Sequence, residues 1–204
     1  MTRRDQPSPE GDPVYASLDA RAVALRDALI DWNLLDEQQV AATQALVDKE
    51  LSPANGARVV ARAWVDAAFK DRLLADATAA AKELGIEGHQ MVAVENTEST
   101  HNVIVCTQCS CTAWPLLGLP PDWYKSPPYR ARVVREARTL LAELGLQIPE
   151  TVAIRVWDTS GETRYLVLPA RPAGTEDFSE EQLAALVTRE SMIGVSLPKA
   201  TQSD

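Results

Sequence analysis

Hydrophobic periodicity changes once along this chain, close to Gly85, and this change constrains the fold more than any other feature. On the N-terminal side, apolar residues recur at three- and four-residue steps, the spacing of one face of an α-helix. On the C-terminal side, short apolar runs typical of strands alternate with further helical segments. We therefore expect an α+β fold with a helical N-terminal arm, residues 1–85, followed by a layered α-β-β-α domain, residues 86–204.

Capping residues divide the N-terminal arm into helices. Ser17 is a candidate N-cap for a helix whose apolar stripe includes Leu25 and Trp32. A second helix is expected from about residue 37 to residue 51. Ser52, which is followed by a proline, predicts the start of a third helix. Asp66 predicts the start of a further helical segment, which ends at Gly85.

The C-terminal half combines strands with two further helices. The runs at residues 91–97 and 102–106 are predicted strands, and residues 129–144 are a predicted helix. Residues 151–157 and 163–169 are also predicted strands, and the turn sequence between them predicts a β-hairpin. Ser179 and Gln182 form a capping-box pattern for a last short helix through Val187.

Composition limits the classes of partner. Of the 204 residues, 46% are hydrophobic and 24% charged, which is ordinary for a folded soluble domain. A net charge of −9 leaves no basic surplus for phosphates and argues against nucleic-acid binding. Arginines do gather between Tyr129 and Arg138, and we interpret them as the solvated face of a helix. Neither a membrane-length apolar run nor a signal peptide is recognisable, so we expect no membrane contact and a cytoplasmic location.

All three cysteines of the chain lie in the stretch VCTQCSCT, at Cys106, Cys109 and Cys111. An odd number of cysteines in a cytoplasmic chain does not suggest a disulfide framework. Cysteine is often buried as a small apolar residue, but the neighbouring Ser110 and Thr112 are not typical of a core. The clustering therefore indicates metal or redox chemistry.

The number of side-chain ligands does not fit the common metal sites. Structural zinc takes four ligands, and neither His89 nor His101 lies at a zinc-finger spacing from the cysteines. Iron–sulfur clusters are commonly held by four thiolates, one more than are present. A redox pair of Cys106 and Cys109 would leave Cys111 unexplained.

The Cys-Ser-Cys sequence offers backbone ligands in place of the missing side chains. A metal held by the sulfurs of Cys109 and Cys111 would lie against the peptide nitrogens of Ser110 and Cys111. Deprotonated, these nitrogens are strong donors, and Cys106 supplies a sulfur from outside their plane. One coordination position stays open for solvent or substrate. Three thiolates and two amidates bring enough negative charge to suit a small trivalent transition-metal ion.

The cysteine loop and its flanks resemble the α subunit of nitrile hydratase and its metal-binding claw. The resemblance includes AWPLLGLPPDWYKSPPYRARVVRE (residues 113–136) and VLPARPAGTEDFSEEQLAALVTRESMIGV (residues 167–195), and it extends from about residue 17 to residue 197. The claw-bearing subunit of thiocyanate hydrolase shares the motif. The resemblance thus implies the family and leaves the substrate open.

The family resemblance implies one non-corrin cobalt(III) ion per chain, with iron(III) as the alternative. Cys106 would be the axial thiolate, Cys109 a sulfinic acid and Cys111 a sulfenic acid, both of which are known oxidation states of cysteine. Thr107 resembles the cobalt form of the family, whereas Gln108 departs from the usual leucine. Thr112 is frequent in iron forms and also occurs in cobalt forms. A β subunit would supply arginines to the oxidised cysteines, and an activator would deliver the metal.

Five further roles follow from the resemblance, each beside a simpler alternative. Ser110 would give a backbone ligand and a hydroxyl near the substrate, or only a local turn bond. Gln90 would lie near the pocket, or would be a plain surface residue. Trp114 would line the substrate channel, or would only pack under the loop. Asp158 and Glu162 would support the pocket from behind, or serve the turn between the two strands together with Arg164.

Three functions remain in competition. The leading one is hydration of a small nitrile to its amide, with the metal as Lewis acid and the Cys111 sulfenate oxygen as nucleophile or base. The second is thiocyanate hydrolysis at the same kind of claw. The third is a non-catalytic metal carrier, which would keep its thiols reduced.

Overall fold

The structure is a computed structural model and describes residues 13–88 and 90–200. The helices are α1 Pro13–Asp31, α2 Glu37–Glu50, α3 Pro53–Val65, α4 Ala67–Ala75, α5 Ala77–Glu83, α6 Trp114–Leu117, α7 Asp122–Lys125, α8 Pro127–Glu143, α9 Glu180–Leu186 and α10 Arg189–Ile193. The strands are β1 Met91–Glu95, β2 Thr100–Val105, β3 Ala153–Asp158 and β4 Arg164–Leu168. The predicted strands agree with the observed ones to within two residues, whereas the short helices α6, α7 and α10 were not predicted.

The strands form two parallel pairs, and the predicted hairpin is wrong. β1 pairs with β4, so that Met91 lies opposite Arg164, and β2 pairs with β3, so that Val105 lies opposite Asp158. The turn between β3 and β4 is present, but each of these strands hydrogen-bonds to an earlier strand. The burial of β2 explains this choice, because it is nearly continuous, as is typical of parallel strands covered on both faces.

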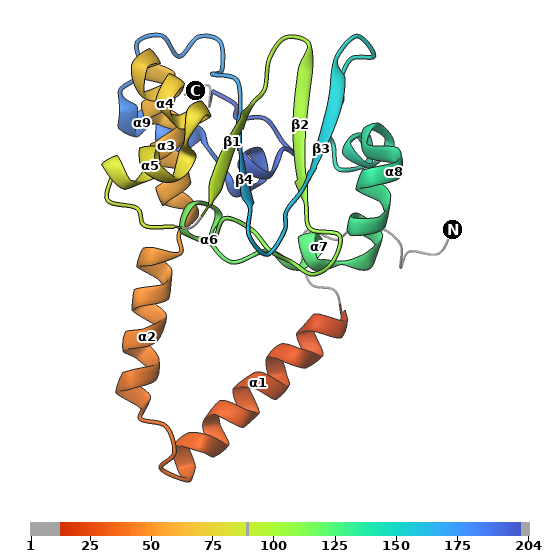
Figure 1. Ribbon diagram of the computed structural model, residues 1–204. Coiled ribbons are helices and arrows are strands. Elements are labelled where there is room, and N and C mark those ends of the chain that lie inside the picture. Colours follow the sequence, from red (N-terminus) through yellow and green to blue (C-terminus); the bar gives the residue numbers. More distant parts are fainter. Residues whose placement is uncertain (1–12, 89, 201–204) are drawn as a thin grey trace.

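The two strand pairs lie between helices, which confirms the α+β fold and its layers. Figure 1 shows α3, α4, α5 and α9 beyond the β1–β4 pair, and α8 beyond the β2–β3 pair. One apolar cluster joins these layers and contains Val59 and Val60 of α3, Ile104 of β2 and Leu140 of α8. The division of the chain near residue 86 stays a prediction, since this cluster draws on residues from both sides of it.

Side-chain caps set most of the helix boundaries. The Ser52 hydroxyl accepts a hydrogen bond from the first turn of α3, and the predicted capping box at Ser179 is present at α9. Asp66 caps α4 as expected. Asp76 then ends α4 and caps α5, so the segment predicted as one helix is two. Ser17 lies inside α1, which begins at Pro13, and is therefore not its N-cap.

Helices α1 and α2 project away from the strand layers as an arm (Figure 1). No residue of α2 is buried. Leu25 of α1 is 60% exposed, and Trp32, which directly follows α1, is 69% exposed. The predicted apolar stripe thus contacts little within the described part of the chain. Among the described helices none is long and apolar enough to cross a bilayer.

Two glycines permit the close contacts that place α6 and α10. A Cβ atom on Gly56 would clash with the carbonyl oxygen of Leu116 and come within 2.7 Å of the sulfur of Met192. Gly194 ends α10 with a φ of 93°, and a Cβ atom there would clash with the backbone of Asn102. The first contact fixes α3 against α6, the helix that follows the cysteine loop.

Candidate metal centre

The three cysteines lie in the loop between β2 and α6, which we call the claw loop (residues 106–111). The sulfur of Cys109 lies 3.3 Å from that of Cys106 and 3.1 Å from that of Cys111, and all three sulfurs are within 4.8 Å of one another. All three cysteines are free; Cys106 is buried, Cys111 half-buried and Cys109 exposed. The sulfurs thus converge around one point, with a buried thiol beneath and an exposed thiol facing outward.

The thiols influence one another's protonation. Hydrogen bonds from Cys111 and Cys106 lower the pKa of Cys109 to about 7. Burial, followed by the hydrogen bond with Cys109, raises the pKa of Cys111 to about 11. The cluster therefore accepts one negative charge readily and resists a second. A bound cation would stabilise the second thiolate against this burial, so the donor set fits a metal ion.

Parallel pairing of β2 with β3 positions one support of the claw loop. Because Val105 lies opposite Asp158, the carboxyl ends of the two strands meet at the same edge. The Asp158 carboxylate accepts hydrogen bonds from the backbone nitrogen of Thr107 at 2.9 Å and from its hydroxyl at 2.6 Å. Asp158 thus fixes the first turn of the claw loop, and this contact is different from the turn role considered as its alternative.

Two side chains that the sequence interpretation did not select hold other parts of the claw loop. The Tyr124 hydroxyl donates to the carbonyl oxygen of Cys111 at 3.0 Å, and Arg130 Nη1 donates to that of Cys109 at 3.3 Å. Burial raises the pKa of Tyr124 far above its ordinary value, so the phenol remains a donor. Both residues lie within the segment quoted for the family resemblance, but their aim toward the claw carbonyls depends on tertiary structure.

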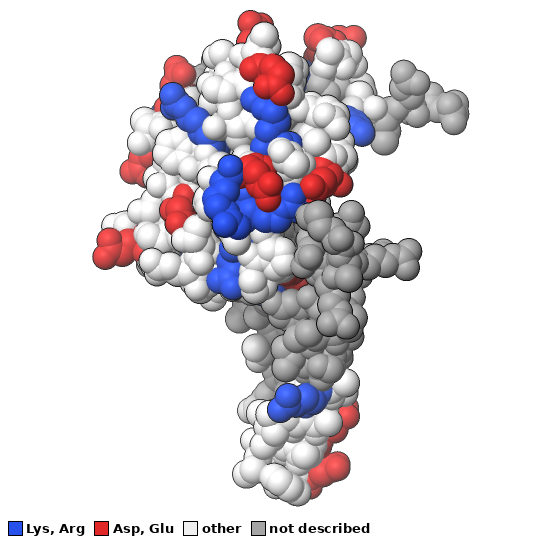
Figure 2. Space-filling model, turned by 90° about the vertical axis from the view of Figure 1, so that its right-hand side faces the viewer, with Lys and Arg blue, Asp and Glu red and all other residues white. Residues whose placement is uncertain are grey.

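The arginines of α8 were predicted to form a solvated helix face, and this is only partly the case. Figure 2 shows the side of the molecule on which α8 lies, where Lys and Arg side chains gather with Asp and Glu side chains among them. Arg135 is exposed, in agreement with the interpretation. Arg132, however, pairs with Glu136 and Glu143, and Arg138 donates to backbone carbonyls near β3.

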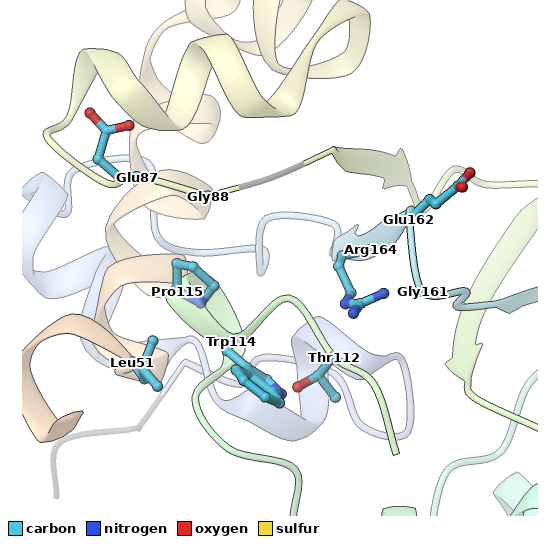
Figure 3. Close-up of a pocket in the computed structure, with 9 residues that line it drawn as sticks. All are labelled: Leu51, Glu87, Gly88, Thr112, Trp114, Pro115, Gly161, Glu162 and Arg164. Carbon is cyan, nitrogen blue, oxygen red and sulfur yellow. The ribbon is translucent and has the colours of Figure 1, made fainter. Parts of the chain in front are cut away.

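A cavity of about 440 Å³ lies beside the claw loop, within the range typical of small-molecule sites. Thr112, the residue after Cys111, lines it together with Trp114 and Arg164. Figure 3 shows Arg164 pointing into this cavity and Glu162 pointing away from it. Arg164 Nη1 is buried without a hydrogen-bond partner among the described residues, so it leaves a cation facing the cavity.

The remaining predicted site residues lie at different distances from the claw. Ser110 lies between two cysteines and is half-buried, and Trp114 lines the cavity with 46% of its surface exposed. Glu162 is exposed at the cavity rim. Gln90 is also exposed, with a φ of 43°, and its carbonyl accepts a hydrogen bond from the Arg164 backbone. Ser110 thus belongs to the claw loop and Asp158 is bonded to it, whereas Trp114 and Glu162 lie at the cavity.

Both ring nitrogens of His101 form hydrogen bonds elsewhere, so His101 does not join the cysteines as a metal ligand. Its Nε2 lies 2.7 Å from the carbonyl oxygen of Gly194, and its Nδ1 lies 3.2 Å from the amide nitrogen of Asn96. His89 lies outside the described residues. Within the described part of the chain, the three cysteines form the one group of potential ligands that converge.

A strand–loop–helix unit that gathers three free thiols beside a cavity defines a thiolate metal site of the claw type. The family model described as nitrile hydratase, alpha chain, matches residues 16–196, and the chain belongs to this family.

Relatives of known name and structure agree with this assignment. The chain is 54% identical over 182 residues to the low-molecular weight cobalt-containing nitrile hydratase subunit alpha of Rhodococcus rhodochrous, covering 88% of each chain. It is similar to the structure of a double mutant of the Fe-type nitrile hydratase of Comamonas testosteroni Ni1, with a TM-score of 0.80, 47% identity and coverage of 91% and 92%. It is 42% identical over 163 residues to thiocyanate hydrolase subunit gamma of Thiobacillus thioparus, covering 73% and 67% of the two chains.

Proposed function

We propose that this chain is the metal-binding α subunit of a nitrile hydratase, which adds water to a nitrile to give the amide. The observation that carries the proposal is the convergence of three free cysteine sulfurs, within 4.8 Å of one another, in a chain of this family. Identity is higher to nitrile hydratase relatives than to the thiocyanate hydrolase subunit, which favours nitriles over thiocyanate.

The proposed cofactor is one trivalent cobalt ion, with iron as the alternative. The sulfurs of Cys106, Cys109 and Cys111 and the backbone nitrogens of Ser110 and Cys111 would hold it. Bound there, the metal supplies a Lewis acid for the nitrile or for water. Thr107 and the cobalt-containing relative support cobalt, whereas the Fe-type structural relative keeps iron open.

Oxidation of Cys109 to the sulfinic acid and of Cys111 to the sulfenic acid is part of the proposal. Cys109 has the properties that oxidation requires, because it is exposed and its pKa is lowered to about 7. The Cys111 sulfenate oxygen would act as nucleophile or base, and the Ser110 hydroxyl would bond to the substrate or to bound solvent.

A few other residues of this chain would support the claw loop and line the cavity in which the substrate binds. Asp158 and Tyr124 hold the backbone of the claw loop at its two ends. Trp114 gives the cavity an apolar wall, while Arg164 provides a cation within it. Glu162 would contribute a carboxylate at the cavity rim, and the Gln90 carbonyl oxygen would help to position Arg164 by accepting from its backbone nitrogen.

The proposed partner is a β subunit, which would supply arginines to the oxidised sulfurs. Anionic sulfur oxygens in a covered pocket need paired cations, and the exposed thiol of Cys109 faces outward, where a partner would reach it. The exposed apolar side chains of the arm, including Leu25, Trp32 and Leu46, support a large interface with that partner. A metal-delivering activator and a cytoplasmic location complete the proposal.

The decisive test is production of the chain with a β subunit in cobalt-supplied cells, followed by metal analysis and assays with a small nitrile and with thiocyanate. We expect one cobalt per α chain, amide formation, and loss of both in Cys109→Ala and Cys111→Ala. Turnover of thiocyanate in preference to nitriles would favour the thiocyanate hydrolase alternative. A reduced claw peptide in the mass spectrum, with readily released metal and no turnover, would favour the carrier.

A further inference from the structure

Arg130 reaches the claw loop from the first turn of α8. Its Nη1 lies 3.3 Å from the carbonyl oxygen of Cys109 and 3.5 Å from that of Thr107. Its Nε is buried and has no hydrogen-bond partner among the described residues. The hydrogen bonds of this guanidinium are thus directed at the backbone of the claw loop.

Neither helix electrostatics nor ion pairing explains a cation at this position. α8 begins at Pro127, so Arg130 lies near the positive end of the helix dipole, where a cation is disfavoured. In the described part of the chain no carboxylate lies within ion-pair distance of Arg130. Arg132 of the same helix, by contrast, pairs with Glu136 and Glu143. The position of Arg130 therefore calls for an explanation at the claw loop itself.

The carbonyl group of Cys109 and the nitrogen of Ser110 belong to the same peptide unit, and this nitrogen is one of the proposed metal ligands. A peptide that binds a metal through its nitrogen as an amidate carries negative charge, and resonance places part of that charge on the oxygen. A guanidinium at this oxygen stabilises the charge through a charge-assisted hydrogen bond.

We propose that Arg130 is a positioning residue of the metal centre: it orients the Cys109–Ser110 peptide and offsets the charge of that peptide as a ligand. This inference rests on the proposed function. It differs from the role proposed for the β-subunit arginines, because those would pair with oxidised sulfurs, whereas Arg130 contacts the backbone. Its second contact, to the Thr107 carbonyl, ties both ends of the Thr107–Cys109 segment to α8.

Three variants of the full chain, each produced with the β subunit in cobalt-supplied cells, test this role. Arg130→Gln keeps a hydrogen-bond donor but removes the charge, and Arg130→Lys keeps the charge but not the planar fork. Arg135→Gln is the matched control, because Arg135 lies on the same helix and is exposed, with its Nε bonded to the Ala131 carbonyl. Cobalt occupancy is measured against increasing chelator, together with the sulfur-to-cobalt charge-transfer absorption and thermal unfolding.

We expect Arg130→Gln to lower the chelator concentration that halves cobalt occupancy about tenfold, the low end for one charge-assisted hydrogen bond. Its charge-transfer band should move to shorter wavelength, because a peptide nitrogen without the guanidinium donates more strongly to the metal. Arg130→Lys should fall between Arg130→Gln and the native protein, and Arg135→Gln should match the native protein.

A native band and native half-occupancy in Arg130→Gln would overturn the proposal, as would equal changes in Arg130→Gln and Arg135→Gln. Should Arg130→Gln not fold, Arg130→Lys decides, and native values in both measurements would contradict a role for the forked contact. The proposed function fails separately, if the native chain with its β subunit holds no cobalt or iron. A metal-loaded native protein beside an unaffected Arg130→Gln refutes the role of Arg130 alone.

Discussion

Replacement of Tyr124 by phenylalanine removes the hydrogen bond from this side chain to the claw loop. The phenol oxygen donates to the carbonyl of Cys111 at 3.0 Å, and the Tyr124 side chain is fully buried. Its ring packs edge-on to Trp123 and tilted against Tyr129, and both contacts survive the substitution. The variant therefore loses the hydrogen bond without creating a large cavity.

The expected loss of stability follows from the acceptor that remains. A buried carbonyl without its partner costs about 1–3 kcal/mol, and the part-buried position of this pair places Tyr124→Phe near 1–2 kcal/mol. For a chain of this length that corresponds to a drop in Tm of roughly 2–8 °C. Tyr129→Phe is a matched control, since its hydroxyl donates at 2.7 Å to the carbonyl of Ile104, inside β2.

Metal retention separates the two variants. Both should lose a similar free energy of unfolding in urea, but only Tyr124→Phe frees the end of the claw loop at Cys111. We expect its cobalt half-occupancy under chelator challenge to fall about fivefold, which corresponds to about 1 kcal/mol, while Tyr129→Phe stays near native. Equal metal retention in the two variants, or an unchanged unfolding free energy in Tyr124→Phe, would show that the hydroxyl does not support the claw.

Three further predictions concern the loop, its neighbouring helix and acid stability. Asp158→Asn should weaken cobalt retention by about tenfold while the fold is kept, since it removes the charged acceptor of two Thr107 hydrogen bonds; native retention in metal analysis would refute this. Gly56→Ala should lower the unfolding free energy by about 1–3 kcal/mol, because the added methyl group meets the Leu116 carbonyl; unchanged thermal unfolding would contradict that contact. Burial lowers the pKa of His101, so the unfolded chain binds this proton more readily, and stability should fall as pH drops below about 6.5; His101→Gln should flatten this dependence in pH-resolved unfolding, and an identical slope would exclude His101 as its source.

Local signals in the sequence were sufficient for three helix starts and for the claw itself. Ser52, Asp66 and Ser179 cap helices where the sequence places them, because each cap depends on residues within one turn. The three cysteines likewise converge because they lie within six positions of one loop. Local spacing was therefore enough to predict both features.

Strand pairing could not be read in the same way. The turn between β3 and β4 has the composition of a hairpin, but the pairing depends on which strands can be buried on both faces. The apolar run at residues 103–105 within β2 was a signal for parallel pairing, and the hairpin prediction gave it too little weight. The alternative role considered for Asp158, in the turn between the two strands, followed from that hairpin, whereas the structure places its carboxylate beside Thr107.

Parallel pairing also explains how three separate elements of the fold support the claw loop. In a hairpin, the end of β3 would lie opposite the start of β4, and Asp158 would be remote from the end of β2. In the observed register, Asp158 of β3 bonds to the backbone at the beginning of the claw loop. Arg130 of α8 bonds to the backbone in its middle, and Tyr124 of α7 bonds to the backbone at its end. These bonds fix peptide groups rather than sulfurs, so the three thiols remain free to ligate and to be oxidised. A loop whose backbone is itself a proposed ligand needs this kind of support, because a displaced peptide would remove a donor as well as a scaffold.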